Sequence, residues 1–222
     1  DLVVSGADYA HTEKLLPQAS RQYSDSYWEK KTFAPSSLLF YVAFDKPIDN
    51  VEHHTLFFDT DFEAHARSIY DTPEWPKKPL FYASFPSKTD ETIAPKGKEA
   101  ATFLIPLAPG LEDSNEVREV YFNKIIERLE YLTKQEVKSH IIFKESYGIN
   151  NFIEDYNSYK GNAYGLANTL LQTAFLRPKL RSKKVKGLYF TGQLTVPGPG
   201  VPPSLISGKL TADLINKYET II

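Results

Sequence analysis

The sequence predicts a mixed fold, in which an α+β layer is combined with pieces of an α/β unit. Apolar segments of strand length follow one another without regular alternation with helices. One long segment has the spacing of an amphipathic helix, and the chain ends in a strand, a turn rich in glycine and proline, and a helix. With 222 residues, the chain can bury a core as one large domain or two small ones.

Composition narrows the range of functions. The formal net charge is −2 and no long lysine–arginine block occurs, so nucleic-acid binding has little support. The absence of cysteine excludes disulfides, thiolate metal sites and a cysteine nucleophile. No apolar run approaches the length of a membrane span.

The first half of the chain is predicted from local patterns. Residues 1–5 are a short apolar strand, and a helix runs from the turn at residues 6–8 to near Leu16, because Pro17 disfavours helical backbone before it. Residues 36–44 are apolar on both faces and predict a central strand. Further expected elements are helical turns at 24–30, strands at 54–58, 80–85 and 102–107, a helix at 61–70 and a polar loop at 86–97.

The opening strand has the composition of a buried strand, which needs a neighbour on each side. No earlier segment of this chain can supply that neighbour, and the chain contains no methionine. We therefore expect the chain to be the C-terminal part of a longer polypeptide, with a processed mature chain as the alternative.

The second half begins with the longest expected helix, at residues 115–133. Its apolar residues recur at three- and four-residue steps, and Asp113 or Ser114 can cap its start. These apolar residues are Val117, Tyr121, Ile125, Leu129 and Leu132. The remaining expected elements are a strand at 137–143, a helix at 151–156, an irregular segment at 157–174, a basic link at 179–186, a strand at 187–190 and a helix at 204–218.

The last helix carries an apolar stripe at Ile206, Leu210 and Leu214, while Ser207 and Gly208 permit close packing. The stretch before it, residues 187–208, reads GLYFTGQLTVPGPGVPPSLISG. A strand, a glycine-rich turn and a helix N-terminus form a corner suited to an anion or a dipole. An ordinary strand-to-helix connection is the alternative.

Polar side chains with a chemical role are hard to select from the sequence alone. Amides and phenols alternate with glycine in residues 157–174, which predicts the wall of a cavity or, alternatively, a tyrosine-rich loop on the core. His53 and His54 are adjacent in a strand, so we expect them to face opposite ways and not to share a metal. No histidine pair has helical ligand spacing, so no metal site is expected, and no carboxylates stand out as a catalytic pair.

Several stretches resemble the carotenoid desaturases of the phytoene desaturase family, which are FAD-dependent phytoene dehydrogenase-like proteins. Residues 187–208, with the core TVPGPGVP at 195–202, resemble the family's C-terminal flavin-binding motif. Residues 73–113 and 157–178 resemble the middle and a later segment of the family, and the opening DLVVSGADY resembles the strand that re-enters its FAD domain. The resemblance covers essentially the whole chain, with the motifs in the family's order.

The resemblance implies the C-terminal part of a glutathione-reductase-type FAD flavoprotein. Residues 1–10 would return to the FAD-binding domain, residues 11–183 would form a substrate-binding domain with an antiparallel sheet backed by helices, and residues 184–222 would add the last strand and helix of the FAD-binding domain. The family binds FAD non-covalently and desaturates a carotenoid precursor such as phytoene or a later carotene. By resemblance, the cofactor would be bound by Gly192, Gln193, Pro199, Gly200, Val201, Pro202 and Ser204, and the substrate by Asn162, Tyr164 and Asn168.

The resemblance also implies partners. These are a hydrophobic polyene, the membrane surface where it dissolves, and an N-terminal FAD-binding half with the pyrophosphate-binding glycine motif that this chain lacks. We expect a cytoplasmic protein that is peripheral on the membrane, and we expect the 222 residues alone to bind FAD weakly or not at all and to be inactive. Gln193 departs from the acidic residue that many relatives have there. The alternatives are another flavoprotein of this fold, such as a carotenoid isomerase or an amine-oxidase-like enzyme, and a non-catalytic lipid-binding domain.

Overall fold

The computed structural model describes residues 1–219, which fall into two compact units. Unit 1 combines the two ends of the chain, Asp1–Pro35 and the residues from Asn151 onward, and unit 2 is Ser36–Asn150. Each unit has its own apolar core. The division into residues 1–10, 11–183 and 184–222 assigns cofactor and substrate roles to segments, and it stays a prediction.

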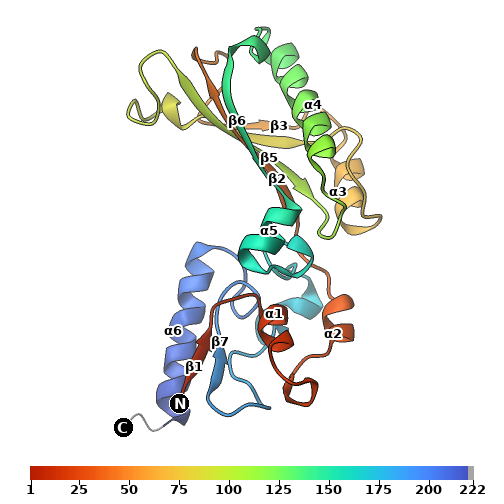
Figure 1. The fold of residues 1–222 in the computed structure, drawn as a ribbon, viewed down its shortest axis with the longest axis vertical. Helices are drawn as coiled ribbons and strands as arrows, with labels where there is room; N and C mark the ends of the chain where they lie inside the picture. The colour runs from red at the N-terminus through yellow and green to blue at the C-terminus, as the bar shows by residue number, and fades with distance from the viewer. Residues whose placement is uncertain (220–222) are drawn as a thin grey trace. The chain divides into compact units, whose positions relative to one another are not determined.

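Unit 2 contains a five-stranded antiparallel sheet in the order β3-β4-β5-β2-β6 (Figure 1). Its strands are β2 (Ser36–Phe44), β3 (His54–Phe57), β4 (Phe81–Ser84), β5 (Glu99–Leu107) and β6 (Ile141–Tyr147). Its helices are α3 (Phe62–Tyr70) and α4 (Asn115–Thr133), with short 3₁₀ turns η2 (Pro86–Lys88) and η3 (Lys138–His140). The predicted mixed fold, with an antiparallel sheet backed by helices, is confirmed.

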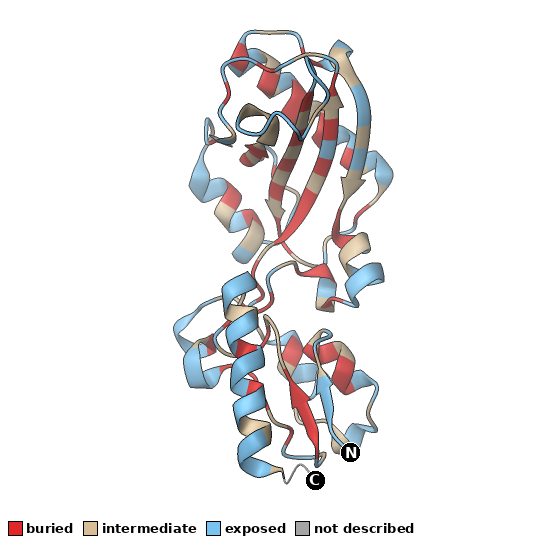
Figure 2. Ribbon diagram, turned by 90° about the vertical axis from the view of Figure 1, so that its left-hand side faces the viewer, coloured by how far each residue is buried: buried red, intermediate tan, exposed pale blue. Residues whose placement is uncertain are grey.

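The core of unit 2 lies between the sheet and α4. Along β5 and most of β2, buried residues alternate with more exposed ones, which Figure 2 shows as red bands along these strands. The buried set packs against the predicted apolar side of α4, where the rings of Phe40 and Phe122 are 5.1 Å apart. One face of the sheet is therefore covered, as the period-two pattern of its strands requires.

The strand expected at residues 137–143 starts later than predicted. α4 ends at Thr133, and its C-cap Lys134 turns the chain with a φ of 57°. The carboxylate of Glu130 accepts the N–H groups of Val137 and Lys138, each at 2.8 Å. These contacts stabilise the 3₁₀ turn η3, so β6 begins only at Ile141. β5 differs in the other direction and begins three residues before the predicted 102, at Glu99.

Unit 1 is organised on a two-stranded parallel sheet, β1 (Val3–Ser5) with β7 (Leu188–Phe190). Its helices are α1 (Tyr9–Lys14), α2 (Asp25–Glu29), α6 (Val201–Tyr218) and most of α5 (Ile149–Tyr156); its 3₁₀ turns are η1 (Gln18–Ser20), η4 (Tyr159–Gly161), η5 (Leu170–Gln172) and η6 (Ala174–Leu176). Tyr9 stacks on Phe190 at 3.7 Å between ring centroids, which joins α1 to β7 in the core.

Helix α6 packs through its small polar residues and not through its predicted apolar stripe. Ser207 and Thr211 are buried, and the Thr211 hydroxyl donates to the Phe190 carbonyl at 2.9 Å, whereas Ile206 and Leu210 are exposed. Small side chains let the helix approach β7 closely enough for these hydrogen bonds. The outer side of α6 is largely pale blue in Figure 2, the colour of exposed residues. Within residues 1–219, no helix is both long enough and apolar enough to cross a membrane.

Candidate functional site

A cavity of about 450 Å³ lies in unit 1 where the turns after β1 and β7 meet. Because the two strands are parallel, their carboxyl ends lie at one edge of the sheet, which is where open α/β sheets bind ligands. The cavity is lined by Gly6, Ala7, Asp8, Phe152, Tyr156, Ser158, Asn162, Ala163, Thr191, Gly192, Gln193, Leu194 and Ser204.

The turn from β7 to α6 depends on glycine. Gly192, Gly198 and Gly200 have φ values of 101°, 135° and 112°, which residues with a side chain rarely adopt. The N–H and hydroxyl of Thr195 both donate to the Gly192 carbonyl, at 3.0 and 2.8 Å, and close the turn. The backbone is therefore exposed to the cavity at Gly192 without a side chain in the way.

Ser207 ties this turn to α6. Its hydroxyl accepts the Gly192 N–H at 2.8 Å, lies 2.7 Å from the Thr191 hydroxyl and donates to the Ser204 carbonyl at 2.7 Å. One fully buried hydroxyl thus fixes Thr191, Gly192 and Ser204, all three of which line the cavity.

The N-terminus of α6 offers a dipole with few hydrogen-bond donors. Gly200 caps the helix, and the Ser204 N–H already donates to the Gly200 carbonyl at 2.9 Å. Pro202 and Pro203 have no N–H, so Val201 alone has one among the first three helical positions. The helix can favour negative charge near this end through its dipole, but not through a row of backbone donors.

Arg177 makes a hydrogen bond to the turn between β7 and α6. Its side chain is buried, and its guanidinium donates to the carbonyls of Gln193 and Leu166, at 3.2 and 2.9 Å, and to the Asn168 side chain at 2.6 Å. A Cβ on Gly198 would lie 3.1 Å from the guanidinium, so glycine is needed there. Within residues 1–219 no carboxylate pairs with Arg177, and burial lowers the pKa of its guanidinium.

Asp8 and Asn162 also line the cavity, and each makes hydrogen bonds that fix the surrounding backbone. The Asp8 carboxylate accepts the N–H groups of His11 and Tyr159, each at 3.1 Å, and burial raises the pKa of Asp8. The Asn162 side chain donates to the Tyr159 carbonyl and accepts the Gly165 N–H, both at 2.7 Å. Asp8 therefore connects α1 to the loop at residues 159–165, whose backbone the Asn162 side chain stabilises.

The structure brings some of the predicted site residues together. Gly192, Gln193, Ser204 and Asn162 line the cavity. Four predicted cofactor residues lie outside the cavity wall, on the rest of the turn and the start of α6: Pro199, Gly200, Val201 and Pro202. The predicted substrate residues Tyr164 and Asn168 also lie outside the cavity wall. Their roles toward a cofactor or substrate stay predictions.

Sequence reasoning missed Arg177 and Asp8 as site residues. Arg177 bonds a carbonyl 16 residues away and Asp8 an N–H 151 residues away, so no local pattern indicates either contact. The resembling segments contain both residues but single out neither.

The expectation that His53 and His54 face opposite ways is wrong. Their ring centroids are 4.1 Å apart, because β3 begins at His54 and His53 lies outside the strand. Each ring already contacts a hydroxyl at 2.6 Å, that of Thr89 for His53 and that of Tyr82 for His54. In the part of the chain that the structure describes, no group of three or more histidine, aspartate or glutamate side chains is placed to hold a metal.

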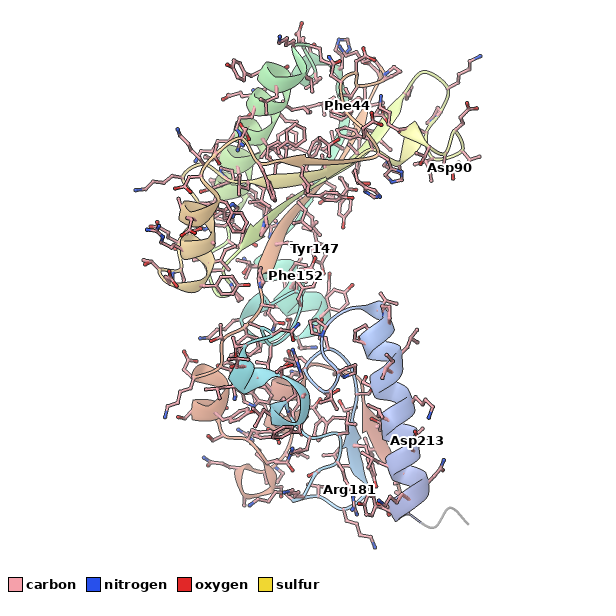
Figure 3. All side chains as sticks on the ribbon, turned by 180° about the vertical axis from the view of Figure 1, so that it is seen from behind. Phe44, Asp90, Tyr147, Phe152, Arg181 and Asp213 are labelled. Carbon is pink, nitrogen blue, oxygen red and sulfur yellow. The ribbon has the colours of Figure 1, made fainter. Side chains whose placement is uncertain are left out.

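A second candidate surface is the sheet face opposite α4 in unit 2. Register places one residue from each strand in a row across this face, and all five are apolar or aromatic. The row is Tyr147, Leu39, Leu104, Tyr82 and Leu56 (Tyr147 is labelled in Figure 3). None of the five is buried, unlike the alternate residues that face α4.

No family model matches the chain. The chain is 46% identical over 216 residues to the carotenoid 3,4-desaturase of Haloarcula japonica, a match that covers 97% of this chain and 44% of that protein. It is 30% identical over 229 residues to the 4,4'-diapophytoene desaturase (4,4'-diaponeurosporene-forming) of Staphylococcus aureus strain Newman, with 96% and 44% covered.

Two solved structures share the fold. An oxidoreductase from Methanosarcina mazei matches with a TM-score of 0.55 and 15% identity, over 97% of this chain and 43% of that one. A putative protoporphyrinogen oxidase from Exiguobacterium matches with a TM-score of 0.54 and 14% identity, over 99% and 42%. The chain thus spans under half the length of the curated relatives that it matches over nearly all its residues. Over nearly all its residues, the chain is similar to carotenoid desaturases.

Proposed function

We propose that this chain is the part of an FAD-dependent carotenoid desaturase that completes the flavin site and supplies a wall for the polyene. The observation that carries the proposal is the cavity at the carboxyl ends of β1 and β7, which Gly192, Gln193 and Ser204 line. These are residues of the segment that resembles the family's flavin-binding motif.

The cavity wall fits part of a flavin cofactor. Gly192 has no side chain and a φ of 101°, which allows close approach of a ligand to the backbone. Thr191, Gln193 and Ser204 supply hydroxyl and amide groups suited to a polyhydroxylated chain. The cavity has a volume of about 450 Å³, which is enough for only a portion of FAD. We therefore propose that this chain shares the cofactor site with another part of the protein.

The chain's own groups would act electrostatically. A flavin bound there supplies hydride acceptance, by which a C–H bond of the substrate is broken and a C=C bond forms as a proton leaves the adjacent carbon. The dipole of α6 and the buried guanidinium of Arg177 place positive potential at the corner, which would stabilise negative charge that develops on a bound cofactor. Arg177 also orients Gln193 through its carbonyl.

The polyene has no polar functional group, so its binding surface must be apolar and aromatic. The row of Tyr147, Leu39, Leu104, Tyr82 and Leu56 has that character across all five strands of unit 2. We assign this face as a wall of the carotenoid site. Asn162, Tyr164 and Asn168 remain proposed substrate contacts, although the Asn162 and Asn168 side chains already make hydrogen bonds within unit 1.

We propose that the open edge of β1 pairs with a strand of the N-terminal FAD-binding half. β7 lies between β1 and the segment around Arg181, whereas within residues 1–219 β1 pairs only with β7. Val3 and Val4 are exposed, although parallel strands are normally buried on both faces. A parallel strand added to β1 would cover them and bring a pyrophosphate-binding loop to the same edge of the sheet.

The test is expression of the complete polypeptide that contains this chain. We expect a yellow protein with a flavin spectrum that converts phytoene or a later carotene to a redder product, acting from the cytoplasmic side of a membrane. A colourless protein would reject the flavin site, and a flavoprotein that oxidises amines or only isomerises carotenes would reject the desaturase assignment.

A further inference from the structure

Helix α3 of unit 2 is attached to the sheet through polar side chains. Its buried residues are His65 and Ser68, each 4% exposed, whereas its aromatic residues Phe62 and Tyr70 are exposed. An amphipathic helix normally buries an apolar stripe instead. The helix lies beside β5 (Figure 1). The hydrogen bonds of His65 therefore decide how α3 meets the sheet.

The two ring nitrogens of His65 make hydrogen bonds of opposite polarity. Nδ1 accepts the N–H of Leu80, and Nε2 donates to the carbonyl of Pro106, both at 2.8 Å. The first partner can only donate and the second can only accept, so the ring is neutral and carries its proton on Nε2. Protonation of Nδ1 would turn two N–H groups toward each other and break the hydrogen bond to Leu80.

The ring takes the place of a hydrogen bond between two strands. β4 and β5 pair with Tyr82 opposite Leu104, and the same register continued by two residues sets Leu80 opposite Pro106. Proline has no N–H, so the two chain segments cannot exchange both hydrogen bonds at that position. The imidazole instead connects the Leu80 N–H to the Pro106 carbonyl, and we call these two hydrogen bonds the His65 bridge. Each bridged residue is two positions from a member of the apolar row, Tyr82 or Leu104.

The surroundings of the ring disfavour a positive charge. Burial lowers the pKa of His65, the hydrogen bond to the Pro106 carbonyl raises it, and the guanidinium of Arg128 on α4 lowers it further. Arg128 is itself held by the carboxylate of Asp59, at 3.3 Å from its Nε, and by the Pro79 carbonyl. The unfolded chain takes up a proton near the ordinary histidine pKa of 6.5 and the folded ring does not, so stability is lost as the pH falls below that value.

We propose that neutral His65 is a positioning residue for the carotenoid site, because its bridge holds Tyr82 and Leu104 in register and protonation of the ring in acid releases them. The inference rests on the proposed function, which assigns the apolar row to the polyene. The bridge is buried within unit 2, so it does not depend on the part of the protein outside this chain. Carotene binding should therefore weaken in acid, although a polyene has no group that titrates.

The first experiment measures amide hydrogen exchange of the complete polypeptide by mass spectrometry, with correction for the intrinsic rate. The two conditions are about pH 7.5 and about pH 5.5, on either side of the ordinary histidine pKa. In the parent, peptides covering residues 80–84 and 101–107 should exchange about tenfold faster or more in acid, since each hydrogen bond of the bridge contributes about fivefold. His65→Gln keeps a donor and an acceptor but does not titrate, so its exchange should be the same under both conditions.

The matched control is His54→Gln, because the His54 ring also titrates and contacts the Tyr82 hydroxyl at 2.6 Å. This control should keep the acid response of the parent. Loss of the response in His54→Gln, or its persistence in His65→Gln, overturns the proposal, as does a parent that shows no response. A measurement on the parent adds a second criterion. The NMR signal of the His65 Cε1 proton, identified by its absence from His65→Gln, should titrate with the same midpoint as the exchange rate, and different midpoints overturn the proposal.

The second experiment connects the bridge to the substrate through the pH dependence of KM for a carotene. In the parent and in His54→Gln, KM should rise in acid at constant flavin content, whereas in His65→Gln it should not change with pH. A KM that stays constant in the parent while exchange accelerates overturns the positioning role. A polypeptide that shows the exchange response but binds no flavin overturns the proposed function and leaves the His65 bridge standing.

Discussion

Replacing Ser207 by alanine should destabilise unit 1 and loosen the flavin corner. The change removes three hydrogen bonds, to Thr191, Gly192 and Ser204, and each contributes about 1 kcal/mol net. The Thr191 hydroxyl can turn toward water, which recovers part of the loss. We expect the free energy of unfolding to fall by about 2 kcal/mol.

The assay is urea unfolding followed by tryptophan fluorescence. The chain has two tryptophans. Trp28 is buried in the core of unit 1, so a Trp75→Phe background leaves it as a reporter of that unit. In the complete polypeptide, Ser207→Ala should also lower flavin content, because Gly192 loses the side chain that positions it.

Ser204→Ala is the matched control. It removes a hydroxyl from the cavity wall but keeps the carbonyl that Ser207 contacts, so it should weaken flavin binding without lowering stability. The reasoning is refuted if Ser207→Ala unfolds within about 0.5 kcal/mol of the parent, the range of ordinary surface substitutions. It is also refuted if the two alanine variants lose equal stability.

Four further changes test other parts of the site. Gly200→Val should abolish flavin retention, because a φ of 112° strains any side chain by about 1–3 kcal/mol; unchanged flavin absorbance counts against the assignment. Arg177→Lys keeps the charge but not the three-way contact, so flavin content should fall, and full retention would leave Arg177 without a positioning role. Leu104→Glu should raise KM for the carotene at constant flavin content, whereas an unchanged KM removes that sheet face from the substrate site. Burial raises the pKa of Asp8 from 3.8, so its ionisation costs stability as pH rises through the raised value; Asp8→Asn should flatten that decline in urea titrations, and parallel pH curves would contradict it.

Local sequence patterns were sufficient for most of unit 2. The apolar run of β2 and the helical spacing of α4 gave both elements with their observed bounds. β5 was predicted too short because Glu99 is polar, yet Glu99 is buried, accepts the Ile48 N–H at 3.3 Å and lies 3.5 Å from the Lys88 ammonium. A buried charge with distant partners has no local signature.

The candidate site shows the same limit. Gly192, Gln193 and Ser204 were expected there from the resemblance to the family's flavin-binding motif, and they line the cavity, while their role toward a cofactor stays a prediction. On α6, the close packing expected at Ser207 is confirmed, because Ser207 is buried. The apolar stripe pointed to Ile206 and Leu210, which are exposed, because hydrogen bonds to β7 and close approach decide the contact.

The most direct test of the central claim is anaerobic mixing of the purified complete polypeptide with a carotene in lipid vesicles, followed by absorbance spectroscopy. We predict that the flavin absorbance bleaches while a polyene band grows at longer wavelength, in equal molar amounts, and that Gly200→Val shows neither change. A polyene product formed without flavin bleaching, or a bound flavin that no carotene reduces, would contradict the claim that this chain completes a carotenoid-desaturating flavin site.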